Sequence, residues 1–110
     1  MSKFLFIESR DPFEFADVVQ TWNLALDLGR EGHEVTCFLV QNAVLAARAG
    51  ARTATLETPA GERMPRVYAD DLSLRERAIE AGALRPGVSA APMETLVDLL
   101  LEAGTRAVWT

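Results

Sequence analysis

The residues best suited to ligand binding are polar side chains at the ends of predicted strands. They are Ser9, Arg10, Gln41, Asn42, Asp70, Asp71 and Ser73. Because hydroxyl, amide and guanidinium groups donate hydrogen bonds, the serine, arginine, glutamine and asparagine of the first two turns could hold a small polar or anionic ligand. Their alternative role is structural: Ser9 and Asn42 could instead cap helices and satisfy the backbone N–H groups of turns. Residue types and spacing leave both roles open.

Asp70 and Asp71 form a pair of adjacent carboxylates at the end of a predicted strand. Such a pair could bind a metal ion, act as an acid and a base, or bind a cationic ligand. We favour a structural interpretation, in which one aspartate caps the next helix and the other is solvated, since no histidine lies near them in sequence. Arg75 and Arg77 follow, and a charged, solvated helix face is the favoured interpretation for them. No metal site and no catalytic residue are therefore predicted.

Cys37 is the only thiol of the chain. It could accept sulfur, but it lies within an apolar run, Val35 to Val40, and a thiol buried in apolar surroundings has a raised pKa. We therefore predict a structural role for Cys37. A lone cysteine also excludes an internal disulfide and a metal site with several thiolates. His33, the only histidine, is expected to be structural or exposed, at the opposite edge of the sheet.

The segment Glu34 to Gly50 is predicted to position the central part of this site. Its apolar run suits a strand that is buried on both faces. Gln41 and Asn42 then interrupt the run, and Asn42 is a good N-cap for a helix over Ala43 to Ala49. Gly50 can take the left-handed conformation that ends a helix. The order strand, polar turn and helix places ligands at the carboxyl end of the strand in open α/β sheets.

The rest of the chain continues this alternation. The predicted elements, in order, are a strand over Lys3 to Ile7, a helix from Asp11-Pro12-Phe13-Glu14 to Glu31-Gly32-His33, a polar excursion or short hairpin over Ala51 to Pro65, a strand over Arg66 to Ala69, a helix from the Ser73–Glu76 capping box to about Ala81, a connector over Leu84 to Ser89, a helix that starts at Pro92 with the apolar stripe Met93, Leu96, Val97, Leu100 and Leu101, and a final strand at Ala107-Val108-Trp109. This alternation predicts a single α/β domain over 1–110. It would have three α/β/α layers and a mostly parallel sheet of four to five strands.

The chain resembles the DsrE/DsrF-like family, of the TusD and YchN type. The stretches that carry the resemblance are Ser9-Arg10-Asp11-Pro12, Gly32-His33-Glu34-Val35-Thr36, Phe38-Leu39-Val40-Gln41-Asn42-Ala43-Val44 and Tyr68-Ala69-Asp70-Asp71-Leu72-Ser73-Leu74-Arg75-Glu76-Arg77. The resemblance implies a small α/β domain that assembles into trimers or hexamers. It also implies sulfur relay through the persulfide of a cysteine after the third or fourth strand. The corresponding stretch here, Tyr68 to Ser73, has no cysteine.

Composition, charge and missing motifs argue against several classes of partner and cofactor. The chain has 110 residues, a net charge of −5 and a hydrophobic fraction of 49%, as is typical of a soluble globular protein. The acidic balance argues against a nucleic-acid or membrane partner. The first residues lack the layout of a signal peptide and no apolar stretch is long enough to span a bilayer, so a cytoplasmic location is expected. Neither a Gly-rich dinucleotide motif nor a Walker motif occurs, and no cofactor is predicted.

These observations predict a non-catalytic or accessory DsrE-like protein that forms a homo-oligomer. It would bind a small ligand or a partner protein in sulfur-related metabolism. One alternative is a small-molecule-binding enzyme or sensor that uses the polar pocket of Ser9, Asn42, Asp70 and Asp71. Another is a sulfur carrier that acts through Cys37.

Overall fold

The computed structural model describes residues 1–110 and contains a five-stranded sheet, in the order β4-β3-β2-β1-β5. Every pair of neighbouring strands is parallel. The elements are β1 (Lys3–Glu8), α1 (Val18–Arg30), β2 (Glu34–Leu39), the 3-10 helix η1 (Gln41–Ala47), β3 (Arg66–Asp70), α2 (Asp71–Glu76), the 3-10 helix η2 (Ala81–Ala83), β4 (Val88–Ala91), α3 (Met93–Leu101) and β5 (Thr105–Trp109). The predicted α/β architecture is confirmed.

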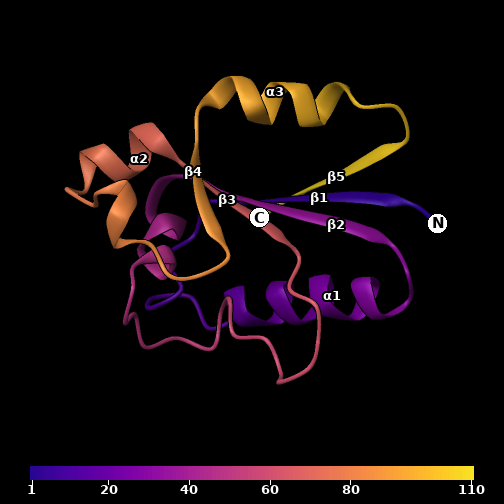
Figure 1. Ribbon diagram of the computed structural model, residues 1–110, viewed down its shortest axis with the longest axis horizontal. Coiled ribbons are helices and arrows are strands. Elements are labelled where there is room, and N and C mark those ends of the chain that lie inside the picture. Colours follow the sequence, from indigo (N-terminus) through magenta and orange to yellow (C-terminus); the bar gives the residue numbers. More distant parts are fainter.

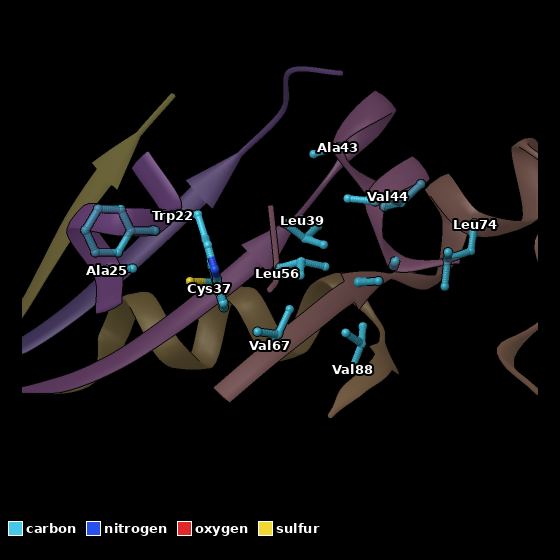
Figure 2. Close-up of a cluster of buried hydrophobic side chains, with 14 of the residues drawn as sticks. Trp22, Ala25, Cys37, Leu39, Ala43, Val44, Leu56, Val67, Leu74 and Val88 are labelled. Carbon is cyan, nitrogen blue, oxygen red and sulfur yellow. The ribbon is translucent and has the colours of Figure 1, made fainter. Parts of the chain in front are cut away.

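Helices cover both faces of the sheet, with α1 on one side and α3 on the other (Figure 1). The α1 side holds the larger core, a cluster of 17 buried residues that includes Phe6, Trp22 and Val67. Figure 2 shows part of this cluster, with side chains from α1, β2, η1 and β3 converging. The α3 side holds a smaller cluster of 6 buried residues around Phe38. None of the helices is long and apolar enough to cross a membrane.

The helix after β2 differs from the prediction. It is the 3-10 helix η1, which begins at Gln41, and its N-cap is Val40. Asn42 does not cap it: its amide oxygen accepts hydrogen bonds from Arg77 instead. Gln41 leaves the strand with φ of 53°. Most of the small residues of η1 are buried, so tertiary packing holds the tighter helix against the intrinsic α-helical preference of alanine.

The start of α1 was also predicted wrongly, whereas its end is confirmed. Residues 11–17 form turns, and the helix begins at Val18. Asp11 Oδ1 accepts a hydrogen bond from Phe13 N–H at 2.8 Å, and this turn closes on itself without continuing into a helix. Phe13 is exposed, so no buried contact favours a helical turn at this point. At the other end, Gly32 has φ of 91° and stops the helix.

The helix after β3 is shorter than predicted and has a different cap. Asp70 is the N-cap, and its carboxylate accepts a hydrogen bond from Ser73 N–H at 3.0 Å. The predicted cap, Ser73, therefore lies inside α2. The helix ends at Glu76 instead of about Ala81, because Ala78 takes a left-handed conformation with φ of 55°.

One connecting segment departs from the prediction and another matches one of its two alternatives. The predicted connector over Leu84 to Ser89 leads into the edge strand β4, which begins at Val88. Over Ala51 to Pro65 the segment is an irregular excursion and not a hairpin. This segment is anchored by Leu56, which is buried in the larger core, and by the indole N–H of Trp22, which donates to the Glu57 carbonyl at 2.7 Å. It is a packed loop on the α1 side of the sheet.

The apolar stripe predicted on α3 is mostly exposed. Leu96 is buried as predicted, but its buried partner is Leu99. The other predicted members, Met93, Val97, Leu100 and Leu101, are exposed. The predicted stripe therefore combines two faces, since only residues 96 and 99 pack against the sheet. The final strand β5 is confirmed.

Candidate functional site

The polar turns after β1, β2 and β3 lie along one edge of the sheet. Glu8 is in register with Leu39, and Leu39 is in register with Ala69. The carboxyl ends of these neighbouring parallel strands therefore meet at a common rim. We call this edge, with the turns that follow the three strands, the carboxyl rim.

A hydrogen-bonded cluster joins two of these turns. Ser73 Oγ donates to Asp70 Oδ2 at 2.6 Å and accepts a hydrogen bond from Gln41 N–H at 2.9 Å. Asp70 is only 4% exposed and Ser73 only 1%. The serine hydroxyl thus connects the start of η1 to the cap of α2. It holds the ends of β2 and β3 together in the protein interior.

Arg77 closes the same cluster from the surface. Its guanidinium donates to Asn42 Oδ1 through Nε at 3.1 Å and through Nη2 at 2.9 Å. Its Nη1 donates to the carbonyl of Ser73 at 3.0 Å. The sequence indicated a solvated charge at Arg77, but the structure gives it a bridging role between η1 and α2. The position of Arg77 in the sequence does not predict this contact, because the contact depends on tertiary packing.

Ser9 and Arg10 belong to a separate network around Glu8. The buried Glu8 carboxylate accepts hydrogen bonds from Ser9 N–H at 3.0 Å and Arg10 N–H at 3.2 Å. Arg10 also binds Asp17 at 2.6 Å, and Ser9 Oγ donates to the Thr110 carbonyl. The hydrogen bond to Glu8 is the largest cause that raises the pKa of Arg10. No hydrogen bond joins this network to the Asp70–Ser73 cluster, so the predicted residues form two groups.

Asp71 stands apart from both groups. Its nearest charged partner is Arg75, at 3.9 Å, and the pair lies at the surface. Asp70 as the cap and Asp71 at the surface is the structural arrangement that the sequence favoured. The chain contains no group of three or more histidine, cysteine, aspartate or glutamate side chains that could hold a metal ion.

The thiol lies in the larger core, among the side chains shown in Figure 2. Cys37 is 5% exposed, and burial together with the nearby Glu8 charge raises its pKa to about 12. A cavity of about 20 Å³ lies beside it, with Trp22 and Thr55 in the wall. This volume is about that of one water molecule, so it leaves no room for a substrate at the sulfur atom.

The largest cleft is on the opposite edge of the sheet. Its volume is about 500 Å³, and it lies between the end of α1, the start of β2 and the segment 63–66. His33 lines it, but none of the predicted site residues does. We call this the amino-edge cleft.

Comparisons with known proteins support the fold. No family model matches the sequence, and no curated protein matches it. Among solved structures, the ychN protein from E. coli is similar with a TM-score of 0.80, and a protein of unknown function from Methanobacterium thermoautotrophicum, MTH1491, with a TM-score of 0.74. Each is 18% identical to this chain, and each comparison covers 100% of both chains. The fold of this chain is therefore that of the YchN structure.

Proposed function

We propose that this chain is a DsrE-like accessory protein, which binds a partner or a small ligand and does not transfer sulfur through a thiol. The observation that carries the proposal is the burial of the only cysteine. Where the family resemblance implies a reactive cysteine after a strand, this chain has Asp70 and Asp71 at the end of β3. Carboxylates cannot form a persulfide, so the binding role is retained without the transfer chemistry.

The electrostatics of Cys37 support this proposal. The thiolate is the nucleophile, and a pKa of about 12 leaves about one thiol in 10⁵ ionised at pH 7. The core side chains around the sulfur atom also exclude a sulfur donor. The alternative of a sulfur carrier that acts through Cys37 therefore requires the core to open first.

The exposed face of α3 supports a role in assembly. Met93, Val97, Leu100 and Leu101 are 44%, 47%, 37% and 78% exposed. Their spacing places them on one side of the helix, away from the buried Leu96 and Leu99. Trp109 is also exposed. It is the register partner of Ile7 in the neighbouring strand, and Ile7 belongs to the smaller core cluster on the α3 side of the sheet. Exposed apolar residues that share one side of a protein mark interaction surfaces, and a second copy of the chain is the proposed occupant.

Val97→Asp is expected to break this assembly. A carboxylate in the centre of an apolar interface has no partner, and its desolvation opposes association. The wild-type protein should form a homo-oligomer, a trimer or hexamer as the resemblance implies, and the variant should be monomeric at the same concentration. Native mass spectrometry and size-exclusion chromatography with light scattering measure the change.

Leu72→Asp is the matched control, because Leu72 is a similarly exposed leucine on α2. It should leave the oligomer intact. A wild-type protein that stays monomeric at high micromolar concentration, or a Val97→Asp protein with the wild-type mass, would contradict the proposed assembly.

A second candidate function is supported by one atom of the carboxyl rim. Asp70 Oδ1 is buried and has no hydrogen-bond partner. A buried acceptor that is left unpaired destabilises a fold, whereas a polar ligand with an N–H or O–H group would satisfy it. A ligand-sensing protein or an enzyme would use Asp70 Oδ1 in this way, as the acceptor for a bound polar ligand. A small molecule that remains bound in native mass spectra of the wild type and is absent from Asp70→Asn would favour this candidate.

A further inference from the structure

The amino-edge cleft contains two arginines that form no ion pair with an acidic side chain. Arg63 and Arg66 both line it, and neither has an ion pair or a side-chain hydrogen bond. Most other arginines of the chain contact an acidic, amide or backbone oxygen, as Arg30 does with Glu62 at 2.7 Å. In a chain with a net charge of −5, the convergence of unpaired arginines on the largest cleft points to an anionic occupant.

The remaining polar groups of the wall are mostly donors or are already bonded. The carbonyls of Asp27, Leu28 and Gly29 at the end of α1 accept hydrogen bonds from the N–H groups of residues 31–33. His33 Nδ1 accepts a hydrogen bond from Ser2 N–H at 3.0 Å, so the proton of the neutral imidazole is on Nε2. Glu34 is the only carboxylate in the lining. The imidazole Nε2 lies 3.8 Å from a carboxylate oxygen of Glu31, so it is not counted as a free donor. The two arginines alone outnumber the single carboxylate of the lining.

The size and the apolar part of the cleft define the occupant further. A volume of about 500 Å³ is within the range of small-molecule sites. Leu26, Val35, Met64 and Pro65 supply an apolar wall beside the arginines. Gly29 opens the wall on the helix side, because a Cβ atom at this position would meet no atom within 4 Å.

We propose that the amino-edge cleft binds a small molecule with an anionic group, a carboxylate or a phosphate, attached to an apolar body. Arg63 and Arg66 hold the anionic group, since a guanidinium pairs with both of these anions through parallel hydrogen bonds. The apolar body lies against Leu26 and Val35. This site is separate from the carboxyl rim, and its occupancy does not depend on the function proposed above.

Titration of the folded protein with phenyl phosphate tests the proposal, followed through the backbone amide chemical shifts in ¹H–¹⁵N spectra. Saturable shifts are expected at Gly29, Gly32 and Thr36, which line the cleft. Benzoate should give the same pattern, inorganic phosphate should bind more weakly because it lacks the apolar body, and benzylamine should give no shifts. Arg63→Gln and Arg66→Gln should each weaken binding about fivefold or more. Glu34→Gln removes a negative charge that repels the anionic probe, so this variant should bind phenyl phosphate more tightly.

Arg52→Gln is the matched control, because Arg52 is also exposed and unpaired but lies outside the cleft. It should bind phenyl phosphate as the wild type does. Gly29→Ala should also bind normally, whereas Gly29→Phe should fill the cleft and abolish binding. The proposal is overturned if phenyl phosphate gives no saturable shifts at these amides at millimolar concentration. It is also overturned if Arg52→Gln weakens binding as much as the cleft variants, which would show general charge attraction.

Discussion

Trp22→Ala is expected to lower the free energy of unfolding by about 3 to 5 kcal/mol, the range for deletion of a large buried aromatic side chain. Trp22 is 3% exposed and belongs to the larger core. It is also the contact that fixes the irregular segment 51–65 to α1, through the hydrogen bond to the Glu57 carbonyl. A loss of this size is a large part of the stability of a typical domain. Equilibrium unfolding in denaturant measures it.

Two further variants separate packing from the hydrogen bond. Trp22→Phe retains part of the aromatic volume but has no donor for Glu57, and a loss between those of the wild type and Trp22→Ala is expected. Leu24→Ala, on the exposed side of the same helix, should change stability by less than about 0.5 kcal/mol. If Trp22→Ala behaved like Leu24→Ala, the packing of the segment 51–65 against α1 would be disproved.

Ser73→Ala is expected to destabilise the protein by about 2 to 3 kcal/mol, more than the removal of an ordinary hydrogen bond. The hydroxyl is buried and bonds on both sides, to Asp70 Oδ2 and to Gln41 N–H. Its removal leaves the Gln41 amide without this partner and takes one donor from a carboxylate that already has an unpaired oxygen. Thermal and denaturant unfolding of the variant measure the loss.

Ser9→Ala provides the comparison at an exposed serine of the same rim. Its hydroxyl makes a single hydrogen bond, to the Thr110 carbonyl, and this bond is exposed to solvent. A loss below about 1 kcal/mol is expected. Equal losses in the two variants would mean that the Ser73 cluster does not hold the carboxyl rim together.

The strands were predictable because buried parallel strands have continuous runs of apolar residues, and such runs can be recognised in the sequence. Lys3 to Ile7 and Val35 to Val40 are continuous apolar runs, which suit a central parallel strand covered on both faces. β4 was missed for the corresponding reason. It is a short edge strand whose Ser89 and Ala90 are exposed, so its apolar content is low.

The helix termini were less predictable because they depend on tertiary contacts. Asp11-Pro12 has the composition of a helix start, yet its hydrogen bonds close a local turn. Ser73-Leu74-Arg75-Glu76 matches a capping box, but β3 continues to Asp70, which takes the cap position first. In both cases the local pattern is compatible with two start points. Packing against the sheet decides between them.

The location of the carboxyl rim follows from strand order, but its connections do not. Parallel neighbours place Gln41 and Ser73 at one edge, as the alternation of strands and helices predicts. The hydrogen bonds of the Arg77 and Glu8 side chains depend on where these side chains lie in the folded protein, and the spacing of residues in the sequence does not predict this. The amino-edge cleft is a further case, because it joins residues of α1 to residues 63–65, which belong to the segment predicted only as a polar excursion or short hairpin.

The most direct test of the proposed function is the mass of the protein after exposure to a small persulfide, such as glutathione persulfide. We expect the folded protein to gain no sulfur atom, because Cys37 is buried and protonated. Protein unfolded in denaturant should gain one sulfur atom, and Cys37→Ala should gain none in either state. A folded wild-type protein that takes up a sulfur atom, with the uptake abolished in Cys37→Ala, would contradict a binding role without thiol chemistry.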